Sequence, residues 1–250
     1  MLSIHQSVVV RAARRPAPLH GRSHARREHF GVQDLRSGAL ICSRWSLPAD
    51  ACCRAAGSAA LAAAPATPGL LRYSVFGELG GGPGLLQLSL WNSTGARDTY
   101  VARANAASPA STDPRLRGCA PQWIECARPE LAYLHDASRP ATCLVVIRQP
   151  LVRADRALAA DWIDSVAAAL SDPGGAPEGL RSATFAVSDR GDVVLILAEW
   201  TSLEAHEQSL RNHDGGIGSS RRWRAVRQHA GIRAEHEVRR FELLGSVEAG

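Results

Sequence analysis

The stretch VVLILAEWTSLEAHEQSLRN, which runs from Val193 to Asn212, contains the change of periodicity that decides the fold. Its first eight residues are almost all apolar and end at Trp200. On a strand, Val194, Ile196 and Ala198 share the face of Trp200, and the alternate apolar residues fill the other face. Because both faces are apolar, we expect helices to cover one side and a second sheet the other.

After Trp200 the same stretch takes on the pattern of a helix. Thr201 is the expected N-cap, and Glu204, three residues later, completes a capping box. Leu203, His206 and Leu210 then follow at helical spacing, so we expect His206 to lie on the inward, apolar face.

The chain contains the pattern twice. The earlier copy, LLQLSLWNSTGARDTYVARAN, ends at Asn105 and places Trp91 109 residues before Trp200. The other elements also match in order, from the opening strands LICSRWSL (40–47) and LVVIRQPL (144–151) to the closing strands near ELAYLHD and RRFELLGSV. Each copy therefore reads strand, helix, strand, strand, helix, strand, which is the ferredoxin-like arrangement.

The predicted fold class follows from this duplication. We expect an α+β chain of two tandem ferredoxin-like (βαββαβ) domains, at 38–138 and 139–250, that form a barrel-like pseudo-dimer within one chain. Residues 1–37 hold seven arginines and two acidic residues, and we expect them to be a disordered basic extension.

Charge and composition exclude several classes of function. Outside 1–37 the chain has 22 arginines and 22 acidic residues, so no basic surplus is left for a nucleic-acid surface. No apolar run approaches the length of a membrane span. The six cysteines have no metal-type spacing, and we interpret them as reduced thiols of a cytoplasmic protein.

His206 is the main difference between the two copies. The matching residue of the first copy is Arg97, with Tyr100 three residues further on. An inward histidine is either a structural residue or a group that transfers a phenolic proton near neutral pH. If the chemistry needs this histidine, only the second copy has it.

The stretch EWTSLEAHEQSLRN, together with the strand before it, resembles the antibiotic biosynthesis monooxygenase family of dimeric α+β barrels. The resemblance covers 143–247, and it extends to 38–138 only through Trp91, Ser93, Ala96 and the order of elements, so the first domain is a degenerate copy. It implies a monooxygenase that acts with O₂ on an electron-rich aromatic polyketide, converting an anthrone or phenol to a quinone or opening a ring.

The resemblance also implies a site and its partners. His206 and Trp200 are the expected catalytic residues, and the expected substrate contacts are Trp91, Trp162, Arg148 and Phe185. The implied cofactor is none, or reduced flavin supplied from outside by a reductase. The expected partners are a small aromatic substrate and O₂, with a homodimer as a further assembly and no metal, nucleic acid or membrane.

Other interpretations stay open at this stage. The glycines of NHDGGIGSSRRWR (212–224) precede an expected helix start and suggest an anion site for a flavin phosphate, or a plain loop. Haem chemistry would use histidines such as His206, His213 or His229, whose spacing does not select haem. A ligand-binding or scaffold protein of the same fold, or a polyketide cyclase or isomerase, are the alternative functions.

Overall fold

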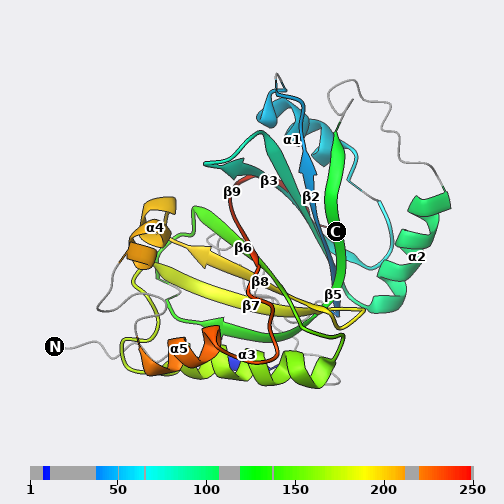
Figure 1. Cartoon of the computed structure of the whole chain (residues 1–250). Helices are drawn as coiled ribbons and strands as arrows, with labels where there is room; N and C mark the ends of the chain where they lie inside the picture. The colour runs from blue at the N-terminus through cyan, green and yellow to red at the C-terminus, as the bar shows by residue number, and fades with distance from the viewer. Residues whose placement is uncertain are drawn as a thin grey trace. The chain divides into compact units, whose positions relative to one another are not determined.

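The computed structural model describes residues 8–11, 38–49, 51–64, 66–106, 119–136, 138–211 and 220–248 (Figure 1). These residues form, in chain order, β1 (Val8–Arg11), β2 (Ala39–Ser46), α1 (Cys53–Ala62), β3 (Leu70–Leu79), β4 (Gly84–Trp91), α2 (Thr94–Ala106), β5 (Ala120–Leu134), β6 (Cys143–Pro150), α3 (Arg156–Ser171), β7 (Leu180–Ser188), β8 (Val193–Trp200), α4 (Leu203–Arg211), α5 (Arg221–Arg227) and β9 (Glu237–Glu248). The predicted order of both copies is confirmed, and α5 is an addition before the last strand.

One compact unit is formed by Ser37–Arg128 and Arg239–Gly250. Its antiparallel sheet places β2 between β5 and β4, and β3 between β4 and β9. Helices α1 and α2 contribute small or aromatic side chains to a core on the sheet face that carries Trp91. The alanine-rich α1 can approach this face closely because its buried residues, such as Ala56 and Ala60, have almost no side chain.

The other unit contains Pro129–Val238. In its sheet β8 lies between β6 and β7, and β5 also pairs with β7. Helices α3 and α5 lie side by side, and α3 packs against β7 (Figure 1). On α3, Trp162, Val166 and Leu170 recur every four residues and are buried, and every residue of β7 and β8 is buried.

The compact units do not coincide with the sequence copies. The last strand of the second copy, β9, pairs with β3 of the first copy from Arg72↔Glu248 to Leu79↔Arg240. The last strand of the first copy, β5, continues beyond Arg128 into the unit of the second copy. Each compact unit is therefore completed by the closing strand of the other sequence copy, which the pattern of residues does not indicate.

Within the N-terminal extension 1–37, the structure describes Val8–Arg11. These residues form β1, whose backbone pairs antiparallel with Leu131–Leu134 of β5. An exposed strand edge offers free N–H and C=O groups to any extended segment, and β-branched valines suit that conformation. The rest of 1–37 lies outside the described residues.

Two glycines at matching places support the duplication in atomic detail. Gly69 and Gly179 both have positive φ, of 89° and 88°, just before β3 and β7. The carbonyl of each accepts a backbone N–H from just after the tryptophan strand, from Asn92 at 2.8 Å and from Thr201 at 2.9 Å. A Cβ on Gly179 would lie 2.7 Å from the Cβ of Ala205, so this glycine allows α4 to approach the sheet.

Candidate functional site

Trp200 ends β8 and has a fixed backbone position. It stands opposite Cys143 of β6 and Leu180 of β7, and only 2% of its surface is exposed. Its carbonyl accepts the N–H of Thr142 at 3.0 Å. Since strands on both sides hold this residue, the indole is presented from a rigid part of the unit.

The helix after Trp200 begins one residue later than the sequence predicts. Because α4 begins at Leu203, the N-cap position falls on Ser202, and Thr201 lies one residue before it, with its N–H bound to the carbonyl of Gly179 at 2.9 Å. The Ser202 hydroxyl accepts the N–H of Ala205 at 3.1 Å. The expected capping box with Glu204 is therefore corrected to a Ser202 cap.

His206 faces inward, as expected from its helical position. It is 3% exposed, and its ring meets the indole of Trp200 edge to face, with centroids 4.9 Å apart and planes at 77°. Ser209 is the other buried residue of α4, whereas Leu210 is 51% exposed, so its expected place on the inward face is wrong. The buried face of α4 is thus narrow and polar, and it is directed at Trp200.

The indole N–H of Trp200 distinguishes this site from the first copy. Trp200 Nε1 is buried and has no hydrogen-bond partner in the described part of the chain. In the first copy Trp91 Nε1 donates to Ser89 Oγ at 2.9 Å. The residue two positions before Trp200 is Ala198, which has no acceptor.

The remaining expected contacts divide into three groups. Phe185 is fully buried and pairs with Ile196, so it shares the sheet face of Trp200. Trp162 is buried where α3 meets α5, and its Nε1 donates to the carbonyl of Val226 at 3.3 Å. Arg148 pairs with Leu195, which places it on the opposite face from Trp200. The structure therefore brings Phe185 to the face of Trp200 and Arg148 to the other face.

The Glu-Trp pair of the motif is also split between the two faces. Glu199 precedes Trp200, so it points away from His206 and accepts a hydrogen bond from Ser182 Oγ at 3.1 Å. Its carboxylate is fully buried in that layer. Glu199 and Trp200 are adjacent in sequence, yet of these two it is Trp200 whose ring contacts His206.

The corresponding place in the first copy has different chemistry. Trp91 stacks on Tyr100, with centroids 5.1 Å apart and planes at 29°. Arg97, at the position of His206, is buried and donates to the carbonyl of Ala127 at 3.2 Å and to Asp98 at 2.7 Å. Burial raises the pKa of the Tyr100 phenol, which keeps it neutral.

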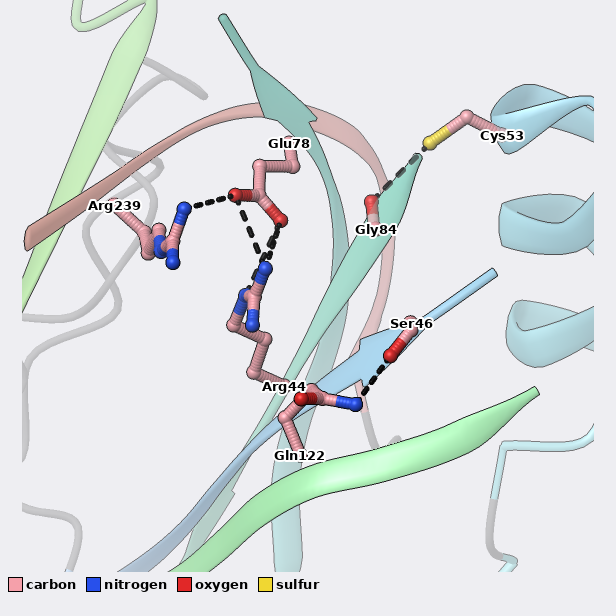
Figure 2. A network of polar contacts seen from close by, with 7 residues as sticks. All are labelled: Arg44, Ser46, Cys53, Glu78, Gly84, Gln122 and Arg239. Carbon is pink, nitrogen blue, oxygen red and sulfur yellow. Dashed lines mark hydrogen bonds and ion pairs between the residues drawn. The ribbon is translucent and has the colours of Figure 1, made fainter. Parts of the chain in front are cut away.

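A polar network in the first compact unit has no counterpart among the sequence expectations (Figure 2). Glu78, whose side chain is 1% exposed, accepts hydrogen bonds from Arg44 at 3.0 Å and from Arg239 at 3.4 Å. A Cβ on Gly84 would lie 2.3 Å from Glu78 Oε2. The glycine run at 80–84, which the sequence indicates only as a turn, therefore also makes room for a buried carboxylate, and that run was the available signal.

Metal-ligating side chains do not gather at one place in the described residues. Among them no three His, Cys, Asp or Glu side chains are placed to hold a metal ion. Both ring nitrogens of His229 are engaged, by Asp161 at 3.0 Å and by the N–H of Gly231 at 3.0 Å. His213 and residues 212–219 of the suggested anion site lie outside the described residues, and Ser220 caps α5 through the N–H of Trp223.

The cysteines are present as thiols, and the helices are short. All six cysteines lie in the described part of the chain and are free thiols, and Cys42 and Cys143 are buried. Burial raises the pKa of the Cys42 thiol above its ordinary value. Within the described ranges, no helix is long and apolar enough to cross a membrane.

Comparison with known proteins defines the class of fold. No family profile matches the chain, and no curated protein matches it in sequence. Solved structures do match it over both copies, and they are proteins of the dimeric α+β barrel type. The predicted fold class, α+β with two tandem ferredoxin-like repeats of that type, is confirmed.

Three of the similar structures give the measure of the likeness. An "anthrone oxidase-like protein" has a TM-score of 0.65 at 14% identity, and the match covers 86% of this chain and 95% of that one. A "putative monooxygenase" from Lactobacillus acidophilus has a TM-score of 0.51 at 11% identity, covering 84% and 96%. One of the same description from Fusobacterium nucleatum has 0.53 at 9%, covering 85% and 94%. At these identities the likeness shows a shared fold.

Proposed function

We propose that this chain is a monooxygenase that uses O₂ to oxidise an electron-rich polycyclic aromatic compound, with the reacting site at Trp200 and His206. The observation that carries the proposal is the buried contact of His206 with Trp200, at 4.9 Å between ring centroids, beside an indole N–H that no described residue accepts. An apolar sheet face bearing a histidine and one donor suits a planar aromatic ligand with a polar edge.

The proposed oxidation needs from the protein one proton acceptor and a buried binding site. His206 would accept the acidic proton of an anthrone or phenol, because imidazole exchanges protons near neutral pH. The resulting carbanion or phenolate can pass an electron to O₂, so the substrate itself is the reductant. For an anthrone, the CH₂ group and O₂ become a C=O group and water, and no external reductant is consumed. The buried setting would protect the reactive anion from bulk water.

The comparisons support the proposal through fold alone. The fold is shared with proteins described as oxidase-like and as monooxygenases. The substrate of this chain, including any role in antibiotic biosynthesis, is our proposal from the site. A requirement for flavin and its reductase is a separate question that the assay below addresses.

The test is O₂ consumption and quinone formation by the purified chain with 1,8-dihydroxyanthrone, compared with a protein-free blank. Parallel reactions with reduced flavin, with and without the anthrone, separate flavin oxidation from substrate oxidation. Catalysed formation of quinone that carries one atom from ¹⁸O₂ is the expected result. Binding without O₂ uptake, across tricyclic and tetracyclic phenols, would instead support a ligand-binding protein.

The residue test uses His206→Ala with His236→Ala as the matched control. His236 is an exposed histidine in the same unit, whose Nδ1 lies 3.3 Å from the carbonyl of Ala234. Loss of the proton acceptor should reduce kcat by about 10²-fold or more, the usual contribution of a general base. Unchanged turnover in His206→Ala, at an unchanged far-UV circular dichroism spectrum, would make this histidine structural.

A further inference from the structure

Trp45, Trp91 and Trp200 lie at or near the end of a strand. The residue two positions earlier is serine for the first two and alanine for Trp200. Residues i and i+2 of a strand lie on the same face, so the earlier side chain is next to the indole. Trp45 Nε1 donates to Ser43 Oγ at 2.9 Å, and Trp91 Nε1 donates to Ser89 Oγ at 2.9 Å. The same local geometry on β2 and β4 thus satisfies both indoles from within their own strands.

At the third tryptophan this arrangement is missing. Ala198 stands two positions before Trp200, and its cross-strand neighbours are Val145 on β6 and Ala183 on β7. None of these three side chains can accept a hydrogen bond. Trp200 is only 2% exposed, and its Nε1–H is buried without a hydrogen-bond partner in the described ranges.

An indole N–H can only donate, so only an acceptor atom can satisfy it. Buried donors without partners are rare in folded proteins, because each carries an uncompensated loss of hydration. A serine at position 198 would remove that loss, as Ser89 does at Trp91. The alanine therefore leaves this buried donor beside His206 without an acceptor from its own strand, at the expense of folding stability.

We infer that Ala198 is a specificity-determining residue: by withholding an acceptor from Trp200, it reserves the indole N–H for an oxygen atom of the ligand. The ligand is an aromatic compound with a ring carbonyl or phenolate oxygen, which accepts from Trp200 Nε1. The first copy does not bind it in this way, because Ser89 already occupies the N–H of Trp91. The aromatic nature of the ligand rests on the proposed function, whereas the need for an acceptor oxygen rests on the N–H itself.

The experiment compares two soluble probes that differ in their ring carbonyls, anthraquinone-2-sulfonate and anthracene-2-sulfonate. Their dissociation constants are measured by calorimetry with the full chain, and neither probe carries the acidic C–H or O–H group with which the proposed oxidation begins. Ala198→Ser should weaken binding of the quinone about tenfold, the usual worth of one hydrogen bond to a buried donor, and leave the anthracene unchanged. Ala198→Val is the matched control, since it adds bulk without an acceptor and should affect both probes alike.

A second variant checks that the effect passes through the indole. Trp200→Phe should remove the preference for the quinone, and adding Ala198→Ser to it should cause no further loss of preference. Equal weakening of both probes by Ala198→Ser, no weakening at all, or a wild-type chain without preference for the quinone would each overturn the inference.

The outcomes separate this inference from the proposed function. If Ala198→Ser abolishes the preference for the quinone and the wild-type chain consumes no O₂ with the anthrone, the oxygenase function is refuted and the specificity role of Ala198 stands. Anthrone oxidation by the wild type, combined with an undiminished quinone preference in Ala198→Ser, sinks the specificity role alone.

Discussion

Exchanging serine and alanine between the two tryptophan strands should change stability in opposite directions. Ser89→Ala removes the acceptor of a fully buried indole N–H, now at 2.9 Å, and leaves that donor without a partner. The expected cost is about 1–3 kcal/mol in the free energy of unfolding. Ala198→Ser offers the missing acceptor to Trp200 and should add about 0.5–1.5 kcal/mol, the net worth of one new hydrogen bond.

Thermal unfolding measures both changes. For a chain of this size each kcal/mol shifts Tm by about 2–4 °C, so Ser89→Ala should lower Tm and Ala198→Ser should raise it by amounts of that order. Ser58→Ala is the control: it removes a hydroxyl bonded to the carbonyl of Arg54 on the exposed side of α1 and should leave Tm nearly unchanged. Either a Ser89→Ala chain as stable as the wild type or an Ala198→Ser chain that is destabilised would refute the reasoning.

Two further predictions concern charged residues. Glu78→Gln should lower the free energy of unfolding in denaturant by about 3 kcal/mol, because the largely buried Arg44 loses the carboxylate of Glu78. Glu130→Gln, in an exposed ion pair with Arg156, should cost at most about 1 kcal/mol. Equal losses in the two variants would contradict this prediction. The hydrogen bond from the backbone N–H of Leu158 contributes most to lowering the pKa of Asp155. The stabilisation by this N-cap is therefore present at neutral pH and is lost as pH falls through the lowered pKa. Asp155→Asn should reduce that loss in unfolding curves recorded from neutral to acid pH, and an unaltered pH dependence would count against it.

Local pattern was sufficient for much of the candidate site. The 3.6-residue period predicted that His206 faces inward, and period-two alternation assigned Val194, Ile196 and Ala198 to the face of Trp200. That Phe185 shares this face follows only from the register of β7 and β8. The same periodicity could have shown that Arg148 and Trp200 lie on opposite faces, once the pairing register was known. Register depends on which residues face one another across strands, and a single strand does not contain that information.

Two expectations about α4 were wrong, one about its N-cap and one about its buried face. Thr201 has the right side chain for an N-cap, but its N–H is bound to Gly179, more than twenty positions earlier in the chain, and the helix begins at Leu203 with Ser202 as its cap. Leu210 fits the apolar period, yet the helix buries His206 and Ser209 instead.

By itself, the sequence determined the two copies, the order of their elements and the asymmetry between His206 and Arg97, because these follow from side-chain pattern and position. Tertiary structure alone decided that β9 completes the sheet of the first copy and that β1 joins β5. Backbone hydrogen bonds between strands are made by groups that every residue carries, so sequence pattern does not specify the partner of a strand. The tertiary structure also decided which indole N–H has no acceptor, because Ser89 and Ala198 differ in their effect only where each lies beside an indole.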